Sequence, residues 1–131
     1  MIAGIYRDLT SEIISDETYE QITQAIGYGK NMMLTPEDMA QQLPDCPVFL
    51  QLYQQYEQQK REQKLFDYDD MLTYTLTVFR RYPDILNTFA QRYRYLNVDE
   101  AQDTSRLQHE IIRMLVSAAG DTITLFMVGD E

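Results

Sequence analysis

About the first ninety residues of the chain carry apolar side chains at helical spacing, separated by charged and amide residues. One stripe includes Ile22 and Ile26, and it follows Asp16, a residue type that favours helix starts. Gly27 and Gly29 come directly after this stripe, and they predict the end of the helix. Four further helix starts are expected, at Thr35-Pro36, at Pro47, at Asp67 or Asp69, and at Pro83.

The pattern changes in the last third of the chain. Residues 95–98 and 123–128 are β-prone runs, and an apolar stripe of helical period lies between them. We expect Asp103 or Thr104 to cap this helix and Gly120 to end it. A strand, a helix and a second strand in this order predict a parallel βαβ unit, with both strands ending at one edge of a sheet.

These elements predict a mainly α protein with a small C-terminal α/β part. We expect a helical region over residues 1–93 and the βαβ unit over residues 94–131. Two parallel strands do not form a stable sheet alone, because parallel sheets are covered on both faces and contain more strands. The chain is therefore expected to be a fragment of a longer protein that supplies the neighbouring strands.

Composition narrows the classes of function. With 131 residues and 44% hydrophobic residues, the chain is long and apolar enough for one modest folded core. No apolar run approaches the roughly 20 residues of a membrane span, so we expect a cytoplasmic protein without membrane contact. The formal net charge of -10 argues against a free-standing nucleic-acid binder, since Lys and Arg supply most non-specific affinity for phosphates.

The chain contains one cysteine and one histidine, so few side chains could serve in disulfide, zinc or histidine chemistry. Cys46 is the only cysteine, which excludes an internal disulfide, and we expect it to be a small packing residue. His109, the only histidine, is expected on the surface of a helix. Asp67, Asp69 and Asp70 place three carboxylates close together, which could suit a metal ion, but helix capping is the interpretation that we favour.

Two adjacent carboxylates, Asp99 and Glu100, directly follow the first β-prone run. In open α/β sheets, ligands bind outside the carboxyl ends of the strands. A phosphoryl-transfer site needs one carboxylate to hold Mg²⁺ and a second group to activate water, and this pair could do both. An isolated Asp-Glu pair is more often only a solvated turn after a strand, so the catalytic interpretation depends on the surrounding sequence.

Four segments of the chain resemble superfamily 1 helicases of the UvrD/Rep/PcrA type, in that family's order. The sharpest is Asp99-Glu100-Ala101-Gln102-Asp103-Thr104, which resembles motif II, the Walker B element. Residues 123–131, with Gly129-Asp130, resemble the strand and the start of motif III. Residues 66–72 resemble the family's Asp-Phe-Asp-Asp-Leu-Leu signature, and residues 26–36 resemble its Ala-Lys-Asn and proline segment.

The resemblance implies a fold and a function. The helical region would be a 1B-like subdomain, and residues 94–131 would be part of the first RecA-like, P-loop domain, from motif II to the start of motif III. The complete protein would be an ATP-dependent DNA helicase, with ATP and Mg²⁺ as cofactors and DNA, single-stranded and at duplex junctions, as its partner. The remaining helicase domains would lie in cis.

The resemblance also implies roles for single residues. Asp99 would hold Mg²⁺ and Glu100 would be the catalytic base, while Gln102 and Asp130 would belong to the nucleotide site. Gln102 and Asp103 would link that site to neighbouring motifs. For Asp103 a second interpretation, a simple helix cap, stays open.

The phosphate-binding loop is the part that the sequence lacks. No Gly-x-x-x-x-Gly-Lys-Ser/Thr pattern occurs, and Gly27-Tyr28-Gly29-Lys30 lacks the required spacing. We therefore expect the fragment alone to be inactive. Two alternatives to the UvrD-type helicase are the helicase subunit of a helicase-nuclease and a non-enzymatic helical interaction module, in which Asp99 and Glu100 would be incidental surface acids.

Overall fold

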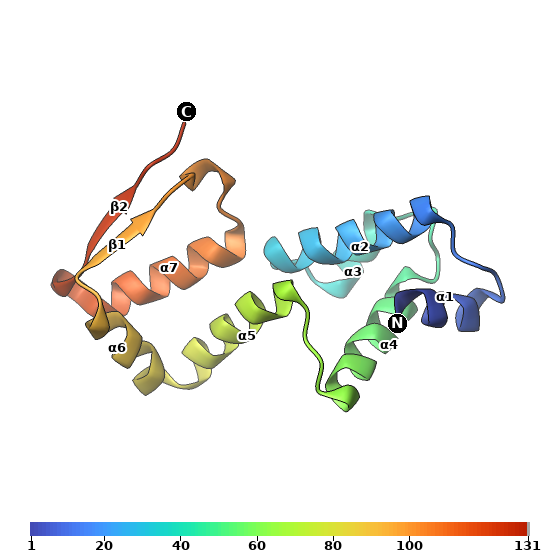
Figure 1. The fold of residues 1–131 in the computed structure, drawn as a ribbon, viewed down its shortest axis with the longest axis horizontal. Helices are drawn as coiled ribbons and strands as arrows, with labels where there is room; N and C mark the ends of the chain where they lie inside the picture. The colour runs from blue at the N-terminus through green and yellow to red at the C-terminus, as the bar shows by residue number, and fades with distance from the viewer. Residues whose placement is uncertain (131) are drawn as a thin grey trace. The chain divides into compact units, whose positions relative to one another are not determined.

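The computed structural model describes residues 1–130, and Figure 1 shows its elements in chain order. The helices are α1 (Ile2–Thr10), α2 (Asp16–Asn31), α3 (Pro36–Gln41), α4 (Phe49–Gln63), α5 (Tyr68–Arg81), α6 (Pro83–Arg92) and α7 (Arg106–Ala119). The strands are β1 (Tyr95–Val98) and β2 (Thr124–Met127), and the 3₁₀ turns are η1 (Ala101–Asp103) and η2 (Gly120–Thr122). The predicted fold class, mainly α with a small C-terminal α/β part, is confirmed. Glu131, the last residue of the segment that resembles motif III, lies outside the described residues.

The chain divides into two compact units, Met1–Asp70 and Met71–Glu131. The boundary expected between residues 93 and 94 concerns the subdomains of a helicase family, and it stays a prediction. Both strands and α7 belong to the second unit. The groups at the carboxyl ends of the strands therefore lie within one compact unit.

The core of the first unit is formed by side chains from α1, α2, α3 and α4. α1 and α3 both contact α4, and α2 contacts α3. The ring of Phe49 is fully buried and stacks on the ring of Tyr53, with centroids 6.2 Å apart. The buried apolar residues of this core are Ile2, Ile5, Ile22, Ala25, Ile26, Met39, Phe49 and Leu52. The helical stripe that begins after Asp16 thus faces the core as its spacing predicts.

α2 continues through Gly27 and Gly29, so the prediction that these glycines end it is wrong. Gly29 is buried against α3, where a Cβ built on it would lie 2.6 Å from Met39 Sδ and 2.7 Å from Met39 Cε. Glycine inside a helix costs about 1 kcal/mol relative to alanine. Here that cost is offset because the missing side chain lets α3 approach α2 closely. The helix ends at Asn31.

Of three helix starts predicted from the sequence, those of α3 and α6 are confirmed and that of α7 is wrong. Thr35 caps α3 by accepting a hydrogen bond from the Asp38 N–H at 3.1 Å, and Pro83 opens α6, as predicted. The predicted cap of α7, Asp103 or Thr104, is wrong. Ser105 is the cap, and it forms a capping box in which its hydroxyl and the Gln108 side chain each accept the other's backbone N–H.

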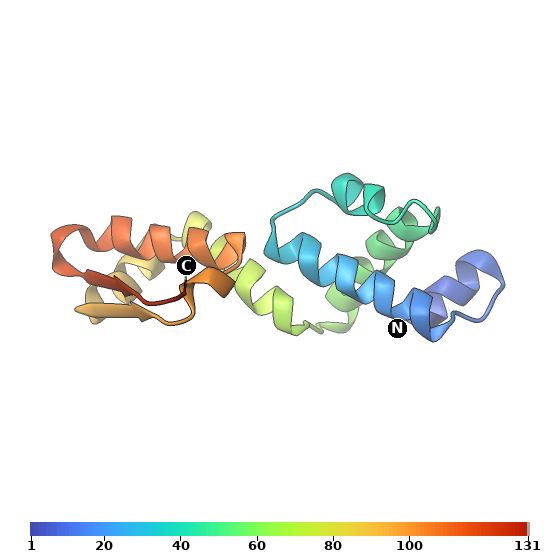
Figure 2. The same ribbon diagram turned by 90° about the horizontal axis from the view of Figure 1, so that it is seen from above.

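The two strands form a parallel pair, with Tyr95 opposite Thr124 and Val98 opposite Met127, which confirms the predicted parallel pairing. Figure 1 and Figure 2 show α7 lying along one face of this pair. Tyr95 and Phe126 stay exposed on the strands, with ring centroids 6.5 Å apart. Within the second unit, α7 therefore covers one face of the strand pair, and the aromatic side chains of Tyr95 and Phe126 are left exposed.

Three expectations from composition can be compared with the described residues. Cys46 packs against the core of the first unit, as expected, and burial raises the pKa of its thiol above the ordinary value. His109 is exposed on α7, again as expected. Across residues 1–130, none of the helices is long and apolar enough to cross a membrane.

We expect Gly29→Ala to lower the free energy of unfolding by about 1 to 3 kcal/mol, because the added methyl group overpacks the contact with Met39. Gly4→Ala is the matched control. No atom lies within 4 Å of a Cβ built at Gly4, so alanine there should raise the free energy of unfolding by about 0.5 to 1 kcal/mol. Urea unfolding followed by circular dichroism measures both changes. Equal effects at the two positions would contradict the packing role of Gly29.

Candidate functional site

The carboxyl ends of the strands bring three acidic residues to one edge of the sheet. Asp99 and Glu100 directly follow β1, Asp130 comes shortly after β2, and all three side chains are exposed. Beyond the strands, the Ala101 N–H donates to the Val128 carbonyl at 2.9 Å, so the two chain segments stay paired. Residues far apart in the sequence thus become neighbours because the strands are parallel.

Glu100 has an unusual backbone conformation. Its φ of 47° and ψ of 48° lie in the left-handed region, which costs a residue other than glycine on the order of 1 kcal/mol or more. Its N–H donates to Asp99 Oδ1 at 2.9 Å, and its carbonyl accepts from the Asp103 N–H at 2.8 Å. These bonds turn the chain sharply from β1 into η1 and present both carboxylates at the turn.

Gln102 connects the two acidic segments of this edge. Its Nε2 donates to Glu100 Oε2 at 2.6 Å, and its Oε1 accepts from the Asp130 N–H at 3.2 Å. The structure therefore places the four residues assigned to the nucleotide site, Asp99, Glu100, Gln102 and Asp130, within one connected group. Asp103, whose predicted role as the cap of α7 is wrong, lies in η1 beside them.

An open groove of about 500 Å³ lies next to these carboxylates. Its walls include Leu72, Asp99, Glu100, Asp103, Thr104 and Gln108. Carboxylate oxygens are the ligands that Mg²⁺ prefers, usually together with water and phosphate oxygens, so the donor set fits this ion. The groove leaves room for such a ligand beside Asp99 and Glu100.

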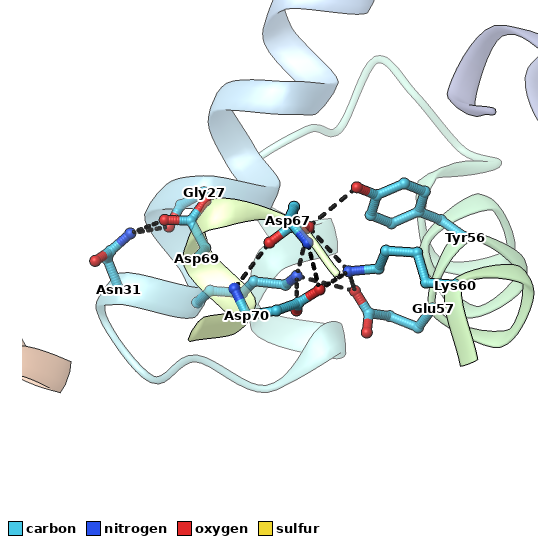
Figure 3. Close-up of polar contacts among 9 residues, drawn as sticks. Gly27, Asn31, Tyr56, Glu57, Lys60, Asp67, Asp69 and Asp70 are labelled. Atoms are coloured by element: carbon cyan, nitrogen blue, oxygen red, sulfur yellow. Dashed lines mark hydrogen bonds and ion pairs between the residues drawn. The ribbon is translucent and has the colours of Figure 1, made fainter. Parts of the chain in front are cut away.

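A second polar cluster lies in the first unit, and Figure 3 shows its side chains. We call it the lysine-carboxylate cluster, and it consists of Lys30, Glu57, Lys60, Asp67 and Asp70. The two lysines are only 7% and 3% exposed. Their ammonium groups lie 2.7 Å and 2.6 Å from the two oxygens of Asp70. Two buried positive charges therefore lie among three carboxylates.

The other acids complete the network. Asp67 Oδ2 accepts hydrogen bonds from Lys30 at 3.1 Å and from Lys60 at 2.9 Å, and the Tyr56 hydroxyl donates to the same oxygen at 3.0 Å. Oxygens of Glu57, Asp67 and Asp70 lie within 4.8 Å of one another, close enough to hold a metal ion. The lysine ammonium groups already supply the positive charge at that position, so we interpret the cluster as an internal ion-pair network.

The cluster joins two segments that resemble the helicase family, residues 26–36 and 66–72. Lys30 bonds to Asp67 and Asp70, and Asn31 Nδ2 donates to Asp69 Oδ1 at 2.7 Å. Figure 3 shows Asn31 and Asp69 meeting beside Gly27. These two segments, which are separate signatures in the sequence, are therefore the two halves of one contact. This contact was not predicted from the sequence, although Lys30, a lysine on the apolar stripe of α2, was a possible signal.

The same acids also start α5. The Asp70 N–H donates to Asp67 Oδ1 at 2.8 Å, and the Asp67 N–H donates to Asp70 Oδ2 at 3.0 Å. This reciprocal pattern is that of a capping box, so of the two predicted caps Asp67 is the correct one. The helix start and the lysine-carboxylate cluster therefore stabilise each other.

Ion pairing outweighs burial in setting the charges of this cluster. Burial by itself would raise the pKa of Asp67, but hydrogen bonds from Lys60, the Asp70 N–H and Lys30 hold that pKa well below its ordinary value. The pKa of Asp70 is lowered for the same reason. Burial would lower the pKa of Lys60, but hydrogen bonds to Asp70 and Glu57 raise it. These three groups are therefore charged at neutral pH.

Comparison with known proteins identifies the relatives of this chain. A family model described as the UvrD/REP helicase N-terminal domain matches residues 1–131. The ATP-dependent DNA helicase PcrA of Staphylococcus epidermidis is 31% identical over 127 residues, which cover 94% of this chain and 17% of the relative. The putative ATP-dependent DNA helicase YjcD of Bacillus subtilis is 34% identical over 112 residues, which cover 86% of this chain and 14% of the relative. The chain thus spans less than a fifth of the length of these relatives.

We expect Lys30→Met to lower the free energy of unfolding by about 3 to 5 kcal/mol, because it leaves the buried Asp70 and the partly buried Glu57 and Asp67 without one of their two cations. Lys64→Met is the matched control, since Lys64 is exposed and forms no ion pair among the described residues. Urea unfolding at neutral pH measures both variants. A loss at Lys30 no larger than at Lys64 would show that the cluster contributes little stability.

Acid should weaken the same cluster. The pKa values of Asp67 and Asp70 in the folded chain lie below the unfolded value of 3.8, so their stabilising contribution is present above that value. It is lost as the pH falls through 3.8 towards the folded pKa values. We expect the thermal midpoint to fall below about pH 4, and Asp70→Asn to flatten this dependence. Asp8→Asn, at an exposed position, should leave it unchanged.

Proposed function

The chain belongs to the UvrD/REP helicase family, and from this membership we propose that it is part of an ATP-dependent DNA helicase. We further propose that its second unit carries the metal-binding and water-activating half of the ATP site. One observation supports this assignment above all others. Asp99 and Glu100 follow β1 and line an open groove, and the parallel pairing brings Asp130, which follows β2, to the same edge of the sheet.

The proposed roles follow from the positions of the carboxylates. Asp99 would be the residue that holds Mg²⁺, which neutralises charge on the phosphates when it is bound. Glu100 would accept a proton from the attacking water. Its Oε2 is engaged by Gln102, whereas its Oε1 accepts no hydrogen bond from any residue that the structure describes. One oxygen of Glu100 is therefore oriented and the other is available as a base.

We propose that the helical region over residues 1–93 corresponds to a 1B-like subdomain and residues 94–131 to part of the first RecA-like domain. Because the phosphate-binding loop pattern does not occur in these 131 residues, other parts of the helicase would bind the phosphates. The chain alone would then neither bind ATP tightly nor hydrolyse it. The helicase subunit of a helicase-nuclease would use the same carboxylates, so the test below applies equally to it.

DNA is proposed as the substrate because the PcrA relatives are named DNA helicases. The formal net charge of -10 disfavours binding to phosphates by charge alone, and Lys30 and Lys60 are neutralised inside the cluster. The chain does present flat side chains next to the cluster, since Phe66 and Tyr68 are 64% and 75% exposed. Exposed aromatic rings are suited to stacking on single-stranded bases, which depends less on charge.

In the complete helicase that we propose contains this chain, Glu100→Gln should retain ATP binding and lower the rate of ATP hydrolysis by about 10²- to 10⁴-fold. The substitution keeps the shape of the side chain but removes the base. Steady-state hydrolysis and equilibrium nucleotide binding measure the two effects. Glu20→Gln, at an exposed position in α2, is the matched control, and the 131-residue chain alone should show no turnover. Normal hydrolysis by the Glu100 variant would refute the assignment and favour a non-enzymatic interaction module.

A further inference from the structure

The amide group of Gln102 makes two hydrogen bonds of opposite type. Its Nε2 donates to Glu100 Oε2 at 2.6 Å, and its Oε1 accepts from the Asp130 N–H at 3.2 Å. A carboxylate can only accept and a backbone N–H can only donate, so the two partners together fix which way the amide points. Gln102 therefore spans from the segment after β1 to the segment after β2 in one orientation.

Gly129 provides the space for this amide. A Cβ built at Gly129 would collide with Gln102 Oε1, and it would lie 3.0 Å from the Ala101 N and 3.3 Å from the Gln102 N. Any residue other than glycine at this position would push the Gln102 side chain away from its site. The glycine and the glutamine are therefore sterically complementary, although 27 positions in the sequence separate them.

We propose that Gln102 is a positioning residue for the Glu100 carboxylate, and that Gly129 lacks a side chain so that the Gln102 amide can reach it. This inference rests on the proposed function of Glu100 as the base. By holding Oε2, the amide leaves Oε1 without a hydrogen bond from any described residue and keeps the carboxylate, which lines the groove, from rotating freely. Gln102 does not need to touch nucleotide or water to act in this way.

The predicted consequence is a loss in kcat rather than in substrate binding. In the complete helicase, Gln102→Met keeps the length of the side chain but removes both hydrogen bonds. We expect it to lower kcat for ATP hydrolysis by about 10- to 100-fold, as expected for a reacting group misplaced by about 1 Å. KM for ATP and the thermal midpoint should stay close to those of the wild type. Gln91→Met, at an exposed position in α6, is the matched control and should change none of these quantities.

A double-mutant cycle tests the role of Gly129. Gly129→Ala should lower kcat to a similar extent, because the added methyl group displaces the same amide. The double variant Gln102→Met, Gly129→Ala should lose no more than the more affected single variant, since both act through one contact. Losses that multiply would overturn the shared mechanism.

The outcome also separates this inference from the function on which it rests. If Glu100→Gln abolishes hydrolysis while Gln102→Met and Gly129→Ala keep wild-type kcat, the positioning role is wrong and the catalytic assignment stands. If Glu100→Gln hydrolyses ATP normally, the proposed function itself fails. A rise in KM that matches the fall in kcat, or a lowered thermal midpoint in Gln102→Met, would indicate a merely structural role and overturn the proposal.

Discussion

The candidate site depends on one constraint, the parallel pairing of β1 with β2. Parallel strands require a crossover, here through α7, and their carboxyl ends then lie side by side. The pairing continues past the strands, because Val128 both donates to Val98 at 2.9 Å and accepts from Ala101 at 2.9 Å. Without this register, Asp130 would not meet Gln102, and the acids after β1 would form an ordinary solvated turn.

The first unit depends on the balance between the cost of burying two lysines and their attraction to nearby carboxylates. Two buried lysines are unfavourable by themselves, and each is stable only because carboxylates surround it. Asp67 and Asp70 contribute to this balance twice, since they bind the ammonium groups and also cap α5. The polar network therefore specifies one arrangement of α2, α4 and the start of α5, which apolar packing alone would specify less strictly.

Local patterns in the sequence predicted the local features of the fold. β1 has the predicted bounds, Pro83 opens a helix, and Thr35 caps one, because each depends on residues close in sequence. Features set by contacts between distant segments were missed. α2 continues through Gly29 because Met39 packs there, and the partner of Lys30 lies forty positions away at Asp70. The cap of α7 is a different case, since Ser105 and Gln108 form a recognisable capping box that nearby Asp103 and Thr104 obscured.

Acidic residues have opposite surroundings in the two units, and the contrast bears on function. In the first unit, one buried and two partly buried carboxylates are matched by two of the three lysines of the chain. At the edge of the sheet, Asp99, Glu100 and Asp130 form no ion pair within residues 1–130, and Gln102 links the segments that carry them. Under the proposed function, Asp99 would hold a divalent cation there together with water and phosphate oxygens. The proposed function uses this contrast, because acids that the fold leaves unpaired stay available to such a cation, whereas the acids of the first unit are already neutralised by lysines.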